Sequence, residues 1–194
     1  MRYKNWLLLI ASILLSTSVM AALNPYWYLA FISSQHPFWT EQDFRSSGQW
    51  FDCAEDKTPR FCTDRVTLHH TSVFAEVSFA SPSSPILEVN SEFSLTHFNG
   101  LQLGLRQDGF QLIKIDIAGV LLDIEQQRQQ HSFAEVDRQV LSLIHRHKAT
   151  TSRTLYWRSD DTQRTVLWKS DQNGIHLIYA HNELMTSLGV TNSE

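Results

Sequence analysis

An alternation of apolar and polar side chains between residues 87 and 121 constrains the fold of this chain more than any other feature. An Asn-Gly pair at 99–100 and an Asp-Gly pair at 108–109 interrupt it. A period of two predicts β-strands with one buried face, and both dipeptides are typical of hairpin turns. We therefore predict three consecutive antiparallel strands, over 87–97, 101–106 and 110–121.

The apolar residues also predict how these strands are aligned. If each turn has three residues and ends on a left-handed glycine, Leu103 faces both Leu95 and Ile113. A preceding strand over 66–79 fits the same meander when Phe79 faces Leu87. One face of the four-stranded meander is then apolar, and the opposite face is polar.

The second half of the chain predicts one main helix followed by more strands. Ser132 and Glu135 have the spacing of a capping box, and apolar residues recur at helical intervals from Phe133 to His147. We expect this helix to lie across the apolar face of the meander. Three short strands should then extend or close the sheet, over 154–158, 165–170 and 175–180. Helix and strands are segregated along the chain, so the predicted fold class is α+β.

The N-terminal segment predicts export. Arg2 and Lys4 are the only charged residues before position 33. A signal peptide with cleavage after Ala21 fits this pattern. A retained anchor also fits, because a helix over 6–26 is about 30 Å long and has aromatic residues at both ends. We favour the anchor, which gives a single-pass inner-membrane protein with its domain in the periplasm. The alternative is a periplasmic protein released after cleavage.

The two cysteines agree with an oxidising compartment. Cys53 and Cys62 should form a disulfide that contributes about 2–3 kcal/mol. Two thiols are too few for a four-ligand metal site, and they do not form a Cys-x-x-Cys motif. We divide the chain into an anchor or signal segment, a short helix with the disulfide loop, a globular α+β domain and a frayed tail. The bounds of these segments are 1–32, 33–65, 66–186 and 187–194.

No motif in the sequence nominates a catalytic site, a metal or a cofactor. The predicted register places His69 directly opposite His97 on the apolar face, where two imidazoles could share a metal ion or influence each other's protonation. The alternative for this pair is an ordinary hydrogen-bonded contact. Asp137 lies within the apolar arc of the main helix, where it would be a buried carboxylate or would turn aside to pair with an arginine.

Three function classes follow. The first is a non-enzymatic accessory protein that assists a membrane-bound partner, such as a sensor, assembly or secretion component. The second is a binding module for a small apolar or lipid-like ligand in a pocket between sheet and helix. The third is an enzyme whose residues converge only in space. A net charge of −4 gives no electrostatic reason to bind nucleic acid, so we expect a protein partner and contact with the membrane through the N-terminal segment.

Overall fold

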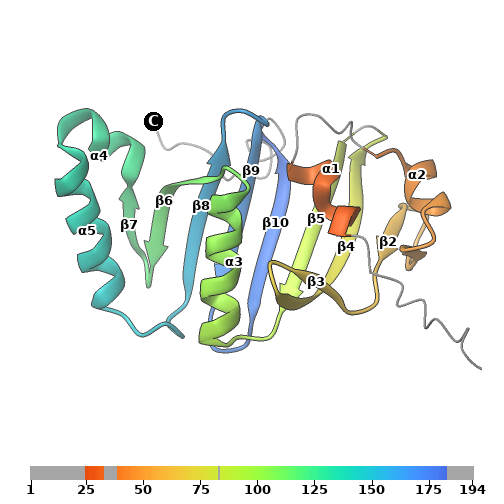
Figure 1. The fold of residues 1–194 in the computed structure, drawn as a ribbon, viewed down its shortest axis with the longest axis horizontal. Helices are drawn as coiled ribbons and strands as arrows, with labels where there is room; N and C mark the ends of the chain where they lie inside the picture. Colours follow the sequence, from red (N-terminus) through yellow and green to blue (C-terminus); the bar gives the residue numbers. More distant parts are fainter. Residues whose placement is uncertain (1–24, 33–38, 83, 183–194) are drawn as a thin grey trace, which may run out of the picture.

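A ten-stranded antiparallel sheet forms the body of the protein (Figure 1), in a computed structural model that describes residues 25–32, 39–82 and 84–182. Its strands follow the order β1-β2-β4-β5-β10-β9-β8-β6-β7, and β3 pairs separately with β4. The fold is therefore α+β and mainly antiparallel, as predicted. The strands are β1 (Phe51–Asp52), β2 (Arg60–Cys62), β3 (Val66–Leu68), β4 (Thr71–Ser81), β5 (Ser84–Ser91), β6 (Gln111–Ile117), β7 (Val120–Asp123), β8 (Arg153–Ser159), β9 (Arg164–Ser170) and β10 (Ile175–His181).

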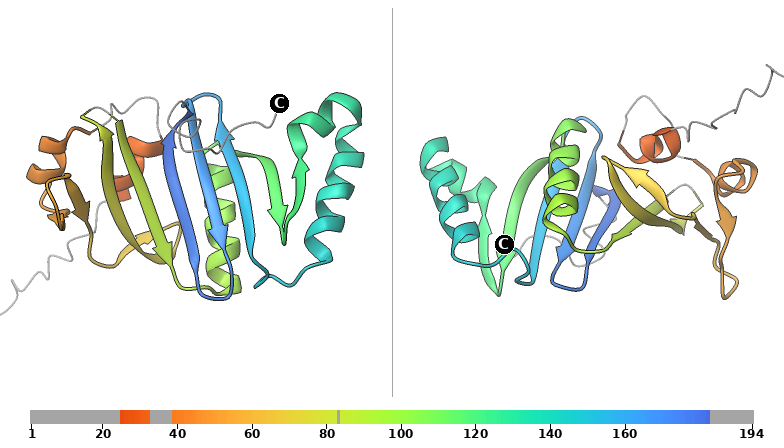
Figure 2. Two further views of the ribbon diagram at one scale, coloured as in Figure 1. Left: turned by 180° about the vertical axis from the view of Figure 1, so that it is seen from behind. Right: turned by 60° about the horizontal axis from the view of Figure 1, so that its bottom comes forward.

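The helices lie on one face and at the two ends of this sheet (Figures 1 and 2). The helix α3 crosses the face, α4 and α5 lie at the end formed by β7, and α2 lies beside β2 at the other end. The described helices are η1 (Pro25–Tyr28), α1 (Leu29–Ile32), α2 (Glu41–Ser46), α3 (Leu95–Gln107), α4 (Ile124–Gln130) and α5 (Phe133–His145).

The predicted middle strand of the meander is wrong, because residues 95–107 form the helix α3. Ser94 caps its N-terminus by accepting a hydrogen bond from the backbone N–H of His97. The buried residues Phe98, Leu101 and Leu105 recur at helical spacing, whereas Leu103 is 57% exposed. Burial therefore follows a period near 3.6, and the alternation of leucines from 101 to 105 was misleading.

The Asp-Gly pair that we assigned to a hairpin ends this helix instead. Asp108 is the C-cap, and Gly109 follows with a φ of +85°. The N–H of Gly109 donates to the carbonyl of Arg106, and the N–H of Phe110 donates to that of Leu105. These two bonds form a Schellman motif, in which a glycine suits the left-handed position. The same dipeptide thus fits a helix end as well as a hairpin.

The face of the sheet beneath α3 carries the main core. Phe98 packs edge-on against Trp168 of β9, with ring centroids 5.3 Å apart. Leu101, Leu105 and Val89 are fully buried in the same cluster. Burying each such side chain stabilises the fold by about 1.5–3 kcal/mol. The helix on the apolar face is therefore α3, and not the later helix that we expected there.

The three C-terminal strands form as predicted but occupy the middle of the sheet. Leu177 of β10 lies opposite Val89 of β5, and Ile115 of β6 lies opposite Leu155 of β8. The strands β8 to β10 therefore separate β5 from β6, which α3 connects by crossing over them. They do not extend the edge of a meander.

The first predicted strand is divided in two. The strands β3 and β4 form a hairpin, and β4 pairs with β5 so that Val77 lies opposite Leu87. The predicted partner of Leu87 was Phe79, so the true register is shifted by two residues. A shift of two keeps every side chain on the same face, so the predicted apolar face of these strands is retained.

The main predicted helix exists as α5 but lies beside β7 at one end of the sheet (Figures 1 and 2). Ser132 is its N-cap, although its side chain makes no capping hydrogen bond. The preceding glutamine-rich residues form α4, which Asp123 caps. Val136 and Leu143 of α5 are buried in the common core.

The core also includes residues that we had assigned to the N-terminal segment. Trp27 and Phe31 are buried, and Trp27 packs edge-on against Trp50. A single cluster of buried residues runs from Trp27 to Tyr179, so η1, α1 and the disulfide region share one core with the rest. Among the described residues, no helix is long and apolar enough to cross a membrane. The proposed spanning or signal segment before residue 25 and the tail over 187–194 lie outside them.

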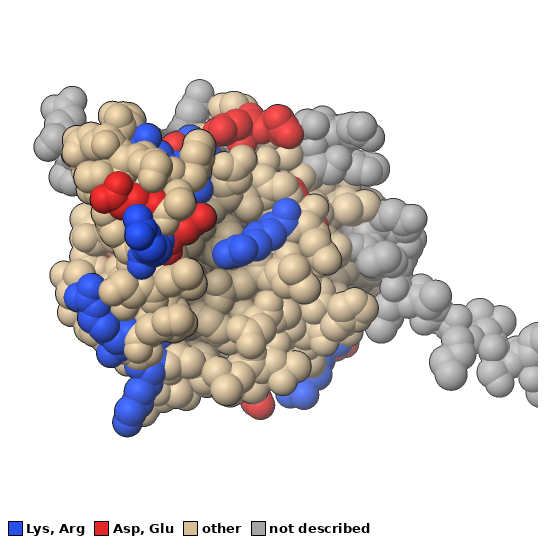
Figure 3. Space-filling model, turned by 60° about the vertical axis from the view of Figure 1, so that its left-hand side comes forward, with Lys and Arg blue, Asp and Glu red and all other residues tan. Residues whose placement is uncertain are grey.

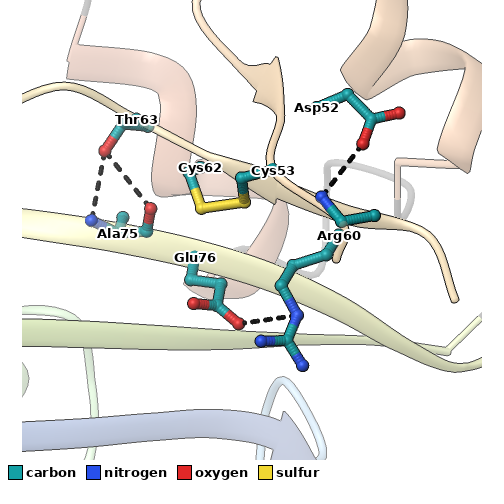
Figure 4. Close-up of a disulfide and its surroundings, with 8 residues drawn as sticks. Asp52, Cys53, Arg60, Cys62, Thr63, Ala75 and Glu76 are labelled. Carbon is teal, nitrogen blue, oxygen red and sulfur yellow. Dashed lines mark hydrogen bonds and ion pairs between the residues drawn. A yellow bond between two sulfur atoms is a disulfide. The ribbon is translucent and has the colours of Figure 1, made fainter. Parts of the chain in front are cut away.

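The predicted disulfide is present (Figure 4). Cys53 and Cys62 are bonded, with their Cα atoms 5.9 Å apart. Phe51 lies opposite Cys62 in the pairing of β1 with β2, so the bond fastens the outermost strand of this end to its neighbour. Thr63, which directly follows β2, adds a link to β4, because its hydroxyl oxygen accepts a hydrogen bond from the backbone N–H of Ala75.

Candidate functional site at the His69 turn

The hairpin turn between β3 and β4 has an unusual backbone. Leu68 and Thr71 are paired, so His69 and His70 alone form the turn. Their φ angles are 45° and 61°. A two-residue hairpin with both central residues left-handed normally uses Asn-Gly, because other side chains are strained there by about 1–3 kcal/mol each. Such strain persists only where the surrounding structure holds it, which makes this turn a candidate site.

Two glycines on α3 provide the space that the turn needs. A Cβ atom at Gly104 would lie 2.0 Å from Cγ of the His69 ring. One helical turn earlier, a Cβ atom at Gly100 would lie 3.3 Å from the hydroxyl oxygen of Thr71. The bare face made by these glycines lets the imidazole lie directly against the helix backbone.

A hydrogen bond between His69 and Asp108 fixes the imidazole at the end of the helix. Nε2 of His69 lies 2.8 Å from Oδ2 of Asp108, and the two side chains are only 10% and 11% exposed. Asp108 caps the C-terminus of α3, where the helix dipole places partial negative charge. A carboxylate at this position needs a donor, and His69 supplies it.

Two tyrosines complete the cluster. The ring of Tyr28 packs edge-on against the imidazole of His69, with centroids 5.7 Å apart. Burial, and then the negative charge of Asp108, raise the pKa of both Tyr28 and Tyr179. The buried hydroxyl of Tyr179 has no hydrogen-bond partner among the described residues. The site therefore combines a carboxylate and an imidazole with two phenols that stay neutral.

A cavity of about 550 Å³ opens beside this cluster. Its inner wall is aromatic and its rim is polar, so it could hold a group with an apolar part and a hydrogen-bonding part. Within the described part of the chain, no set of three or more His, Cys, Asp or Glu residues is arranged to hold a metal ion. The lining consists of Trp27, Tyr28, Gly48, Gln49, Thr63, Asp64, Arg65, Val66, Thr67, His69 and His70.

The structure does not bring His69 and His97 together. His97 lies in the first turn of α3, whereas His69 contacts Asp108 at the other end of that helix. Nδ1 of His97 is 3.1 Å from the hydroxyl oxygen of Ser91 and 3.0 Å from the carbonyl oxygen of Glu92. The predicted pairing required residues 95–107 to be a strand. Because they form a helix, the hypotheses of a shared metal ion and of coupled protonation are both wrong.

Asp137 is also placed differently from the prediction. It is exposed on α5, because that helix turns Val136 and Leu143 toward the core. The hypothesis of a buried carboxylate is therefore wrong. A helix at the end of a sheet buries a narrower stripe than one that crosses its face, and the outer part of the predicted apolar arc is left in solvent. Phe133 and Leu141, for example, are both exposed.

Four residues of the site were missed by the sequence analysis, namely Tyr28, Gly104, Asp108 and Tyr179. The available signal was the i, i+4, i+8 spacing of Gly100, Gly104 and Asp108, which places all three on one face of a helix. No protein-family model, curated protein or solved structure matches this chain. The proposed function therefore rests on the geometry and chemistry of the site itself.

Proposed function

We propose that this chain is an exported accessory protein that binds a membrane-bound protein partner at the His69 cavity and has no catalytic activity of its own. One observation carries the proposal. Two of the residues that line the cavity, Trp27 and Tyr28, belong to η1. This short helix directly follows the apolar N-terminal segment in the sequence. A retained segment would thus hold the cavity next to the membrane surface, where a membrane-bound partner is within reach.

Chain length is compatible with such an anchor. A helix over residues 6–24 would be about 28 Å long, which approaches the thickness of a hydrocarbon core. The domain begins immediately afterwards, at Pro25. The burial of Trp27 and Phe31 accounts for their apolar character without a membrane, so these residues no longer favour an anchor over a cleaved signal peptide. The retained anchor remains our proposal, and release into the periplasm is its alternative.

The composition of the site supports binding more than catalysis. The imidazole of His69 is already engaged by Asp108, and the neighbouring phenols are neutral. No hydrogen bond joins His69 to a serine, threonine or cysteine in the described part of the protein. A fixed hydrogen-bonding group beside an aromatic wall suits recognition of a side chain or a small molecule.

A second candidate function is the binding of a small apolar or lipid-like ligand. It is favoured by the aromatic wall that Trp27 and Tyr28 form with the neighbouring Val66. We had placed this ligand between sheet and helix, but core residues such as Leu101 and Leu105 fill that interface. The ligand would therefore occupy the His69 cavity, and the two candidates compete for one site.

Photo-crosslinking in cells distinguishes these functions. A photoreactive phenylalanine at Thr67, which is exposed and lines the cavity, should capture one membrane protein. The same group at Asp161, exposed in the turn between β8 and β9, is the matched control and should capture none. Equal capture from both positions would contradict the proposal. A small molecule released from the purified protein in native mass spectrometry, without protein capture, would establish the second function instead.

A further inference from the structure

The two ends of the sheet are protected very differently. At one end β1 has only two residues, and the disulfide fastens it to β2. At the other end β7 pairs with β6 and has no second strand partner among the described residues. Val120 and Leu121 of β7 are 50% and 54% exposed. Proteins usually protect such an edge with charges, prolines or a covering element, since its free backbone groups can pair with another chain.

A groove of about 460 Å³ lies between this edge and α5, which runs beside β7. It is lined by the consecutive residues Val120, Leu121 and Leu122. Consecutive side chains of a strand point to opposite faces, so a hollow that touches all three follows the edge of the backbone. The opposite wall is formed by α5 and its C-cap residue, and it is polar except for the buried Leu143. Its residues are Glu135, Arg138, Gln139, Ser142, Leu143 and Arg146.

The helix wall of the groove carries unpaired positive charge. Arg146 donates to the hydroxyl of Ser142 at 2.9 Å, which holds its guanidinium in place. Glu135 lies 3.5 Å from His131 and so has a partner of its own. Within the described residues, neither Arg138 nor Arg146 forms an ion pair with a carboxylate. Figure 3, in which this side of the molecule is turned forward, shows basic and acidic side chains around a largely uncharged surface.

We propose that this groove binds an extended peptide segment of a partner protein, which adds to β7 as a further strand and presents carboxylates to Arg138 and Arg146. The free backbone groups of β7 would provide the main-chain hydrogen bonds of strand addition. Val120 and Leu121 would contact apolar side chains, and the arginines would select acidic ones.

Charge argues against a second copy of this chain as the occupant. Pairing β7 with β7 of another copy would place the guanidinium groups of both copies at one interface, where like charges repel. The inference also goes beyond the proposed function, because it concerns the opposite end of the sheet from the His69 cavity. It can be tested on the purified domain without reference to that cavity.

Binding of short synthetic peptides tests the proposal. The probe is an acetylated heptapeptide that alternates valine with glutamate. One control replaces glutamate by lysine, and another carries N-methyl groups on alternate amides, which block strand pairing. We expect the glutamate peptide to slow hydrogen exchange at the β7 amides, and both control peptides to have no effect.

Charge reversal gives an independent readout. The double variant R138E/R146E should bind the glutamate peptide about tenfold more weakly and should gain affinity for the lysine peptide. The variant Arg128→Glu is the matched control, because Arg128 is exposed on the neighbouring α4 but does not line the groove. It should leave binding nearly unchanged.

Three outcomes would overturn the inference. The first is the absence of β7 protection at millimolar concentrations of the glutamate peptide. The second is equal binding of the glutamate and lysine peptides. The third is protection of β7 that rises with protein concentration in the absence of peptide, accompanied by a dimer in sedimentation equilibrium, which would identify a second copy as the occupant.

Discussion

Replacement of Gly104 by alanine provides the sharpest test of how the His69 turn is held. In an ordinary helix this change is favourable by about 1 kcal/mol, because glycine is a poor helix former. Here the new methyl group would lie 2.0 Å from Cγ of His69. The methyl group would meet the ring itself, which the hydrogen bond to Asp108 fixes. The imidazole therefore has to leave its position.

The expected loss can be assembled from two contributions. Overpacking a tight contact is unfavourable by about 1–3 kcal/mol. Displacing the imidazole also breaks the largely buried hydrogen bond to the Asp108 carboxylate, a kind of bond that contributes about 1.5–3 kcal/mol. After subtracting the gain in helix propensity of about 1 kcal/mol, we expect Gly104→Ala to lower the free energy of unfolding by about 1.5–5 kcal/mol.

A second substitution should remove most of this effect. Glycine at position 69 adopts the left-handed backbone without strain and has no ring to meet the new methyl group. In the background of His69→Gly, Gly104→Ala should therefore be neutral or stabilising. The matched control is Gly100→Ala, where the nearest atom is 3.3 Å away, and we expect a loss below about 1 kcal/mol there.

Urea unfolding of the four variants and the wild-type domain, followed by circular dichroism with the disulfide intact, measures each free energy. The reasoning is refuted if Gly104→Ala is as stable as the wild type. It is also refuted if the effects of Gly104→Ala and His69→Gly simply add, because residues that clash directly must be coupled.

Three further predictions concern other parts of the protein. Replacing Cys53 and Cys62 by serine should lower the free energy of unfolding by about 2–3 kcal/mol, measured against the same protein with the bond intact; an unchanged urea midpoint would contradict this. Tyr179→Phe should leave thermal stability unchanged or raise it, because the hydroxyl removed is buried without a partner among the described residues; a large loss would reveal a partner for that hydroxyl. The hydrogen bond from His176 holds the pKa of Glu88 below its ordinary value of 4.5, so the stability that this pair contributes is present above about pH 4.5 and is lost as the pH falls below it. Glu88→Gln should consequently flatten the acid side of the stability curve, and a parallel curve would argue against the pair.

The fold could be predicted from the sequence wherever the apolar residues fit the period of only one element, strand or helix. The strands β8, β9 and β10 and the helix α5 fall where the pattern placed them. The segment over 95–107 failed because Leu101, Leu103 and Leu105 alternate, while Phe98, Leu101 and Leu105 also fit a helix. Single-sequence periodicity does not separate these alternatives, and the decision comes from packing against β4, β8 and β9.

The candidate site illustrates a different limit. His69 was singled out by a register argument that placed it beside His97, and the structure gives it Asp108 instead. The two members of that pair are 39 residues apart and meet only because α3 ends next to the β3–β4 turn. Predicting a strand where α3 forms therefore gave His69 the wrong partner, although His69 itself does lie in the candidate site.

The central position of β10 has a consequence for how the protein is made. The hydrogen bond between Glu88 and His176 joins positions 88 residues apart. The edge of β5 that faces away from β4 stays unpaired until β10 arrives. Contacts between such distant residues slow folding, because a long loop must close first. An exported chain of this topology would remain without its complete sheet until residue 181 had left the translocation channel. If the chain is exported as we propose, late closure would keep it unfolded enough to cross the membrane until its last strand has emerged.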